Sequence, residues 1–500
     1  MSIAQTLVLA LAFVLVPLVA HAQLMIIGND EKLTFDKTGK TIRRPPGKDS
    51  VSIVDISNPE APKILVNLPL MNSIVGPPTN LAITPDQKLA IVANSVDWQK
   101  DGDDWKQVPD TKLYVIDLST SPPSHIATVD VGKQPSGLSI NKAGTLALVA
   151  NRADNSISVL SISGKEVKLI DTVPMGEQIS HVVFTPDGKR ALAAKFPGHK
   201  IAMLDVDGQK VTYGKYDMPV GLWPYNVDVT PDGSIALTAD NGNAGGSDGH
   251  IDTVSVIDLE ATPPRVIDRV AVGDSPEGLT ISPKGDLAAV VLLRGSNQAW
   301  NSWYYNRNGS VVILKIDGKK VTYGKYDMPV GLWPYNVDVA PHGSIAITAD
   351  NGNAGGSDGH IDTVSVIDLE ATPPRVIDRV AVGDAPEGLA ISPKGDLAAV
   401  VLLRNSNGAW NSWFYNRYGS VVILNIDGKK VTKLDEIEVR ALPEGVAWSP
   451  DGKYLYVGNY MDSDLSILKV VDTKKGPRVV NMGKSLKLPG QPASMRARNQ

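Results

Sequence analysis

The most constraining feature of this sequence is a long segment that occurs twice in tandem. Residues 211–320 and 321–430 align without a gap and differ at about ten positions, including Thr230/Ala340, Asp232/His342, Gln298/Gly408 and Tyr304/Phe414. A chain that accepts a second copy of such a segment is built from modules that pack on their neighbours. A recent internal duplication, or an engineered one, explains the pair. The 500 residues therefore reflect the number of modules and not several separate domains.

A shorter pattern recurs throughout the chain. The first strand begins at Pro-x-Gly and ends in a Pro-Asp-Gly or Pro-Lys-Gly turn. A second strand follows, and then a third with the pattern Ser-Val-x-Val-Ile-Asp. A fourth strand leads to the next Pro-x-Gly. Strands of about five to seven residues at a period of about 40 to 55 residues are typical of β-propeller blades. First strands are expected near Thr79, Pro135, Gln178, Pro224, Pro276, Pro334, Pro386, Pro443 and Gln491. The sequence thus predicts an all-β fold, a single propeller of nine four-stranded antiparallel blades.

The two ends of the chain complement each other. LMIIGND and SVSIVDIS, near the N-terminus, resemble second and third strands, whereas QPASM from Gln491 resembles a first strand without successors. Pairing them would complete a blade and remove the exposed sheet edges of an open array. We expect the C-terminal strand to close the ring on the three N-terminal strands.

The N-terminus and the composition indicate an exported protein. An apolar stretch from Leu7 to Val19 precedes Ala20-His21-Ala22, which predicts a signal peptide over residues 1–22 and a propeller over residues 23–500. A membrane anchor is the alternative, but the apolar stretch is short for a span, and no stable span is expected after cleavage. The absence of cysteine excludes disulfides, thiolate metal sites and C-x-x-C-H haem attachment. We expect a periplasmic or secreted monomer.

Charge argues against one class of partner. The net charge is −5, and Lys and Arg form no basic stripe. Phosphate backbones require such a stripe, so no nucleic-acid partner is expected.

Several segments resemble a known repeat. VANRADNSISVLSI from Val149, VGNYMDSDLSIL from Val457 and the Ser-Pro-Asp-Gly turn resemble the YVTN-type β-propeller repeat. The resemblance covers essentially the whole mature chain and implies a propeller in the periplasm. The wider group includes lactonase-like propellers and subunits that dock on redox enzymes. The resemblance implies a fold and a compartment more than a reaction.

The strand order places two kinds of loop on one face of the ring. The loops that enter the first strands include GLWPYN from Gly221 and GDSPEG from Gly273, and insertions between second and third strands begin at Asn94, Ala239 and Leu293. Aromatic rings with amides and guanidinium groups suit a sugar, an aromatic ligand or a protein hot spot. The alternative is a loop that buries its own rings as a small satellite core. The predicted binding residues, present in both copies, are Trp223, Tyr225, Asn226, Trp300, Trp303, Tyr304, Arg307, Trp333, Tyr335, Asn336, Trp410, Trp413 and Arg417.

Two further groups of residues are weaker candidates. The glycine-rich insertions are rich in oxygen ligands, so Ca²⁺ is possible although no cofactor is predicted, because the spacing does not match an EF-hand loop. The metal candidates are Asp240, Asp248, His250, Asp350, Asp358 and His360. A Glu–Arg pair near the pore could polarise a carbonyl or position a water. The alternative is structural, namely that each Glu caps a turn or pairs with an Arg of a neighbouring blade. The catalytic candidates are Glu277, Arg294, Glu387 and Arg404, with Glu444 in the same Pro-Glu-Gly context.

Three functions remain open from the sequence. The first is a binding or interaction scaffold whose loop-rich face engages a periplasmic protein or a small polar ligand, without catalysis. The second is a lactonase-like hydrolase, and the third is a non-catalytic subunit of a periplasmic redox complex. The second copy of the duplicated segment either repeats the candidate site or only enlarges the ring.

Overall fold

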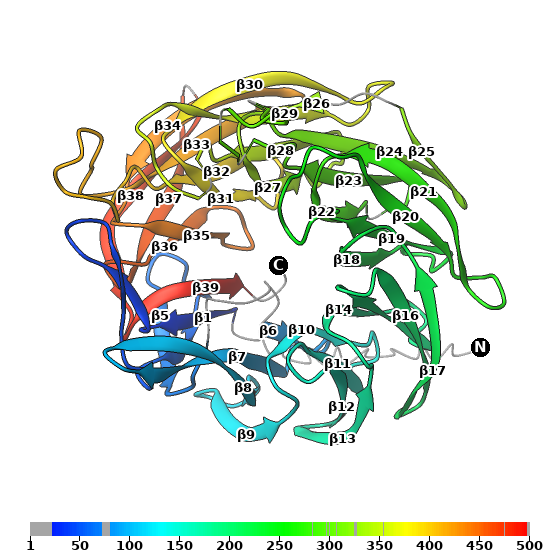
Figure 1. The fold of residues 1–500 in the computed structure, drawn as a ribbon. Coiled ribbons are helices and arrows are strands. Elements are labelled where there is room, and N and C mark those ends of the chain that lie inside the picture. Colours follow the sequence, from blue (N-terminus) through cyan, green and yellow to red (C-terminus); the bar gives the residue numbers. More distant parts are fainter. Residues whose placement is uncertain are drawn as a thin grey trace, which may run out of the picture.

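The computed structural model describes residues 23–497 except 73–80, 283, 297, 300, 307, 325–327, 354 and 475. The predicted signal peptide and Thr79 lie outside the described residues. The described residues form a ring of nine blades (Figure 1). Each blade is an antiparallel sheet whose first strand lies nearest the ring axis, as predicted. The other strand starts agree with the sequence within a residue or two.

Blades 1 to 5 each run from an inner strand at the ring axis to an outer strand at the rim. Blade 1 holds β39 (Gln491–Ala497), β1 (Leu24–Asp30), β4 (Ser50–Asp55) and β5 (Lys63–Leu68). Blade 2 holds β6 (Leu81–Ile83), β7 (Leu89–Asp101), β8 (Asp104–Asp117) and β9 (Ser124–Asp130). Blade 3 holds β10 (Pro135–Ile140), β11 (Leu146–Asn151), β12 (Ser156–Ser163) and β13 (Glu166–Pro174). Blade 4 holds β14 (Ile179–Phe184), β15 (Arg190–Lys195), β16 (Lys200–Asp207) and β17 (Lys210–Pro219), and blade 5 holds β18 (Pro224–Val229), β19 (Ile235–Asp240), β20 (Asp252–Asp258) and β21 (Arg265–Gly273).

Blades 6 to 9 follow the same order. Blade 6 holds β22 (Pro276–Ile281), β23 (Leu287–Leu292), β24 (Ser310–Asp317) and an outer edge split into β25 (Lys320–Tyr323) and β26 (Met328–Pro329). Blade 7 holds β27 (Pro334–Val339), β28 (Ile345–Asp350), β29 (Asp362–Asp368) and β30 (Arg375–Gly383). Blade 8 holds β31 (Pro386–Ile391), β32 (Leu397–Leu402), β33 (Ser420–Asp427) and β34 (Lys430–Glu438). Blade 9 holds β35 (Pro443–Trp448), β36 (Tyr454–Asn459), β37 (Asp464–Thr473) and β38 (Gly476–Lys487).

The ring closes in blade 1, as the two ends of the sequence predicted. Strand β39 pairs antiparallel with β1, which pairs with β4, and Asp30 lies opposite Gln491 in the ladder. A small hairpin of β2 (Leu33–Phe35) and β3 (Thr41–Arg43) follows β1. Closure satisfies the backbone groups that two free edges would expose.

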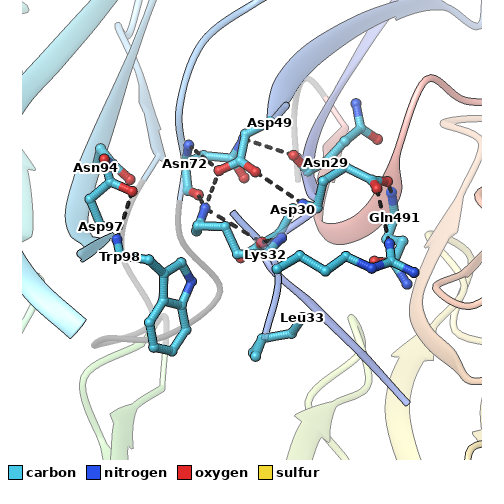
Figure 2. Close-up of polar contacts among 12 residues, drawn as sticks. Asn29, Asp30, Lys32, Leu33, Asp49, Asn72, Asn94, Asp97, Trp98 and Gln491 are labelled. Atoms are coloured by element: carbon cyan, nitrogen blue, oxygen red, sulfur yellow. Dashed lines mark hydrogen bonds and ion pairs between the residues drawn. The ribbon is translucent and has the colours of Figure 1, made fainter. Parts of the chain in front are cut away.

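A buried ion pair stands beside this closure (Figure 2). The Lys32 ammonium lies between the carboxylates of Asp49 and Asp30 and donates a hydrogen bond to the backbone carbonyl of Asn72. All four side chains are buried. The pairing compensates for removing these charges from water and ties the β1–β2 connection to the chain that precedes blade 2.

The cores lie between neighbouring blades and consist of small and branched apolar side chains. Between blades 3 and 4, for example, Leu148, Val159 and Ile179 are fully buried in one cluster. The second strands are covered on both faces and are therefore apolar runs, such as the fully buried β11, whereas outer strands such as β13 are largely exposed. In the described part of the chain no helix is long and apolar enough to cross a membrane.

One expected loop is a strand extension. The insertion from Asn94 was predicted to be a loop on the candidate face, but β7 and β8 continue pairing through it to Asp101 and Asp104. Trp98 is buried on this extension. Alternating apolar and polar residues, VDWQK facing DWKQV, favour a hairpin over an irregular loop.

Candidate functional site

The two predicted insertions of the first copy meet between blades 5 and 6. The amide of Gly295 donates to the hydroxyl of Ser247 at 2.8 Å, which joins the aromatic insertion to the glycine-rich one. Gly249 has a φ of 82°, and a Cβ there would stand only 2.5 Å from Tyr304 Cβ and 2.6 Å from the Trp303 ring. Glycine is therefore required at this position both for the backbone conformation and for the aromatic contact.

A pocket of about 570 Å³ opens where these insertions meet. Trp303 stands edge-on to Tyr304 at 5.2 Å and to His250 at 6.2 Å. Arg294 and Asp274 contribute a guanidinium and a carboxylate to the lining. The pocket thus combines a ring surface with donors and acceptors, as ligand sites do.

The second copy repeats the arrangement. The amide of Asn405 donates to the Ser357 hydroxyl at 2.7 Å, and a Cβ on Gly359 would meet Trp413 and Phe414. Trp413 stands edge-on to Phe414 at 5.2 Å, the same separation as in the first copy. The two insertions therefore meet twice on the ring, two blades apart, as the duplication predicted.

The exposure of the tryptophans decides between the two interpretations of the aromatic insertion. Trp303, Trp410 and Trp413 are 76%, 64% and 80% exposed. A satellite core would have buried these rings, so that alternative is wrong for all three. Trp300 and Arg307 lie outside the described residues.

Arg417, in the second aromatic insertion, faces neighbouring side chains. Its guanidinium lies 3.3 Å from the Asp462 carboxylate and packs on the Tyr418 ring. The guanidinium of Arg417 thus contacts both Asp462 and Tyr418. It takes no part in the contact between Gly359 and Trp413.

The loops that enter blades 5 and 7 form a second aromatic feature. Trp223, at a φ of 54°, packs edge-on against Phe196 at 4.9 Å and His199 at 5.4 Å, and its amide donates to His199 Nδ1. Tyr225 contacts the same Phe196. The Trp223 ring is half-buried, and its contacts with Phe196 and His199 hold it against blade 4.

The remaining residues of these loops have different surroundings. The Asn226 amide donates to the Leu279 carbonyl and so bridges blades 5 and 6. In the second copy Trp333 also has a positive φ and Asn336 is exposed, whereas the Tyr335 side chain is not described.

The metal candidates separate into two groups. Asp240 and Asp350 are buried, and hydroxyl groups hold them, with Thr253 and Ser255 donating to Asp240 at 2.8 and 2.7 Å. Burial raises the pKa of Asp240 to about 6, and the hydroxyl donors partly offset that rise. The oxygens of these two carboxylates are buried and accept hydrogen bonds from hydroxyl groups of their own blade.

An acidic cluster forms next to them. One oxygen each of Asp358, Asp362 and Asp384 lies within 4.8 Å of the others, a spacing that could hold a divalent ion. In the first copy burial raises the pKa of Asp252, the counterpart of Asp362, to about 7, and the carboxylates of Asp248 and Asp274 raise it further.

The histidines of these insertions are exposed. His250 and His360 each place Nδ1 3.1 Å from a neighbouring aspartate, Asp248 or Asp358. Sequence analysis found one member of the acidic cluster, Asp358, and missed the other two, Asp362 and Asp384. Asp362 is the first residue of the third strand β29, and Asp384 lies just before Pro386-Glu387-Gly388. Both positions belong to the predicted loop-rich face, which was the signal in the sequence that could have identified them.

The Pro-Glu-Gly glutamates occupy β-bulges at the inner ends of blades 6, 8 and 9. In blade 6 the ladder shifts between Pro276 and Gly278, so Glu277 is the extra residue and its side chain leaves the strand pattern. The Asn241 amide donates to Glu277 at 2.8 Å, and burial raises the pKa of this carboxyl to about 7. Glu277 thereby connects blade 5 to blade 6.

Glu387 and Glu444 lie close enough to repel each other. Burial raises the pKa of Glu387 to about 7, while burial and then the charge of Glu387 raise that of Glu444 to about 8. One of the two carboxyls therefore keeps its proton near neutral pH.

In the second copy the candidate Arg404 contacts side chains of its own blade. Its guanidinium donates to Asn416 at 3.1 Å and lies 3.9 Å from the Glu438 carboxylate. Arg294 lines the pocket between blades 5 and 6, where the described lining does not include Glu277. The arginines follow second strands and lie at the aromatic insertions, whereas the glutamates lie in bulges of the first strands, where Glu277 accepts from Asn241 of the neighbouring blade.

Comparison with known proteins gives one family match. Residues 111–222, in blades 2 to 5, match the family described as lactonase, seven-bladed β-propeller. The resemblance is to lactonase propellers. The match ends before the aromatic insertions and the Pro-Glu-Gly bulges. No protein of curated function matches the sequence.

Solved structures share the fold of lactonase propellers and related rings at low identity. The dihydro-heme d1 dehydrogenase NirN is 13% identical with a TM-score of 0.52, over 84% of this chain and 74% of that one. Hydrazine synthase of Kuenenia stuttgartiensis is 18% identical with a TM-score of 0.45, over 80% and 97%. The periplasmic gluconolactonase of Pseudomonas aeruginosa is 13% identical with a TM-score of 0.41, over 95% and 98%. At 13% identity, the similarity to NirN shows a shared fold and no activity.

Proposed function

We propose that this protein is an exported binding propeller, periplasmic or secreted, whose loop-rich face holds two equivalent sites for a small polyol such as a sugar or a sugar lactone. The observation that carries the proposal is the exposed Trp303 ring at a pocket of about 570 Å³, with the same ring contact repeated at Trp413. Large aromatic side chains exposed beside a pocket are typical of binding sites.

The chemistry of the pocket suits this class of ligand. An indole face stacks on the C–H face of a sugar ring and removes both from water. Arg294 and Asp274 offer charged donors and acceptors for the hydroxyl groups, and such hydrogen bonds are stronger than neutral ones. Because Gly249 and Tyr304 fix the tryptophan from behind, little side-chain entropy is lost on binding.

The test is a fluorescence titration of the full chain with a panel of monosaccharides and aldonolactones. Replacing Trp303 and Trp413 together by Ala should weaken binding at least tenfold and leave the thermal transition almost unchanged, because both rings are exposed. Trp105→Ala, on the β7–β8 hairpin, is the matched control and should leave binding unchanged. Unchanged binding in the double variant would overturn the proposal.

A second candidate function is hydrolysis of lactones at Glu387 and Glu444. The observation that favours it is the neighbouring, half-buried pair of carboxyls, whose raised pKa values of about 7 and 8 would supply a proton donor and a general base near neutral pH. Purified protein should then hydrolyse a lactone with a bell-shaped pH profile, and Glu387→Gln should lower kcat at least a hundredfold. No turnover above background, with or without a chelator, excludes this function.

A further inference from the structure

The duplication creates one interface between blades that combines two faces with different partners elsewhere in the ring. The interface of blades 5 and 6 recurs between blades 7 and 8, because both lie inside the duplicated segment. Between blades 6 and 7 the situation differs. Strands β22 to β24 of blade 6 copy those that blade 8 turns to blade 9, whereas the outer edge of blade 6 at Met328 copies Met218 of blade 4. Blade 7 presents the face that its copy, blade 5, turns to blade 4. We call the interface of blades 6 and 7 the copy junction.

Between blades 8 and 9 the bulk comes from blade 9. Trp448 of β35 is fully buried, and its Nε1 donates to the Ala390 carbonyl of β31 at 3.0 Å. The indole belongs to one buried cluster with side chains of blade 8 that include Ala399 and Ile423. Large and small side chains alternate across this interface, which fills it.

Between blades 4 and 5 the bulk comes from blade 4. Leu192 and Met203 of blade 4 pack with Val227 of blade 5, which is 1% exposed. At the position that Trp448 occupies in blade 9, blade 5 has Val229. A small face of blade 5 therefore meets a large face of blade 4.

At the copy junction both faces are small. Blade 6 offers Ala289 and Ile313, the counterparts of Ala399 and Ile423, and blade 7 offers Val339 where blade 9 has Trp448. The large buried side chain at this junction, Met328, lies on the outer edge of blade 6, and neither inner strand offers a counterpart of Trp448. Ala289 and Ile313 are accordingly 9% and 8% exposed, whereas both of their counterparts are 0% exposed.

A cavity of about 910 Å³ opens at this place and extends toward the ring axis. Its apolar lining comes from both sides of the junction, with Ile281, Ala289, Ile313, Val337, Val339 and Leu369 among the residues. Lys284, Asp286 and His342 contribute polar groups to the lining near the turns. Cavities lined by aliphatic side chains bind aromatic molecules of matching size.

We propose that the copy junction binds a planar aromatic N–H heterocycle of the indole type, in the position that the Trp448 side chain occupies between blades 8 and 9. The carbonyl of Thr280, the counterpart of the Ala390 carbonyl, accepts the ligand N–H. The ligand supplies the bulk that Val339 lacks and removes the surrounding apolar walls from water. This site is separate from the two loop-face pockets.

The experiment is an equilibrium titration of the full chain with indole, followed by ligand-observed NMR. Saturable binding of one indole is expected, and Val339→Trp should abolish it and raise the melting temperature, because the introduced indole fills the cavity. Val229→Trp is the matched control, since the same change faces Leu192 and Met203 and should leave indole binding intact while lowering the melting temperature. 1-Methylindole should bind about tenfold more weakly, as the loss of one hydrogen bond implies.

Two outcomes would overturn the proposal. Either indole shows no saturable binding, or it binds equally to wild type and to folded Val339→Trp. If Val339→Trp fails to fold, a chain lacking residues 321–430 replaces it in the experiment. That deletion places Trp448 against blade 6 and so fills the cavity. Retained indole binding in the shortened chain would then overturn the proposal. Sugar binding at the loop-face pockets serves as an independent measure of folding in Val339→Trp.

Discussion

At the scale of single residues, the unusual feature is a set of carboxyl groups that burial keeps partly protonated. Glu444 sits in a bulge beside Glu387, and its pKa is raised to about 8. A β-bulge removes the side chain from the regular ladder and directs it into a site chosen by the surrounding blades. These residues are where a change of pH should act first.

Glu444→Gln should stabilise the protein at alkaline pH. An acid whose pKa is raised in the folded state contributes stability below its unfolded pKa, near 4.5, and loses that contribution as the pH rises through about 8. The free energy of unfolding of wild type should therefore fall over this range, and the variant should exceed it by about 2 kcal/mol at pH 9. Urea denaturation at pH 5 and pH 9 measures the difference, which should nearly vanish at pH 5. Equal stability at pH 9 would show that Glu444 is not buried as described.

At the scale of structural elements, ring closure depends on strand β39 and on the buried pair that follows β1. Lys32, Asp49 and Asn72 join the β1–β2 connection to the segment before blade 2 (Figure 2). The strand pairing itself was readable from the two ends of the sequence. The ion pair was not, because Lys32 and Asp49 are polar residues in irregular segments and only the fold brings them together.

Lys32→Ala should destabilise the closed ring by about 3–5 kcal/mol, since it leaves Asp30 and Asp49 as uncompensated buried charges. The measurement is chemical denaturation at neutral pH. Lys88→Ala is the control, because Lys88 forms an exposed pair with Asp86 at 3.4 Å and should lose less than about 1 kcal/mol. A similar small loss in both variants would contradict the structural role of Lys32.

At the scale of the whole molecule, the duplication sets both the size of the ring and the number of its sites. The nine blades exceed the seven of the matched family by the two that the second copy adds. A propeller accepts added blades because each blade packs only on its neighbours. The second copy therefore repeats the loop-face arrangement and also introduces the copy junction.

A chain lacking residues 321–430 should fold as a seven-bladed ring with one loop-face site. The deletion joins blade 6 to blade 9, so Trp448 meets Ala289 and Ile313 in the packing that blade 8 shows. We expect a melting temperature at least as high as that of the full chain and half the ligand stoichiometry, one instead of two. Calorimetry and a titration measure these quantities. An unfolded product would show that the nine-bladed ring depends on the junction.

The sequence by itself determined the fold, the strand order, the closure and the meeting of the two insertions. These features depend on local signals, namely turn residues, strand periodicity and the order of segments, which act within a few residues of the chain. The deviation in blade 2, where a loop was expected and β7 and β8 continue, was also visible in the alternation of its residues.

Only the tertiary structure decided which of these residues face a ligand. It buried Asp240, placed Asp362 and Asp384 beside Asp358, and paired Arg404 with Asn416. It also revealed the copy junction, since Val229 and Val339 occupy identical positions in two nearly identical segments and differ only in the blade they meet. Packing across an interface depends on the volumes of both sides, and residues far apart in the chain supply those two sides.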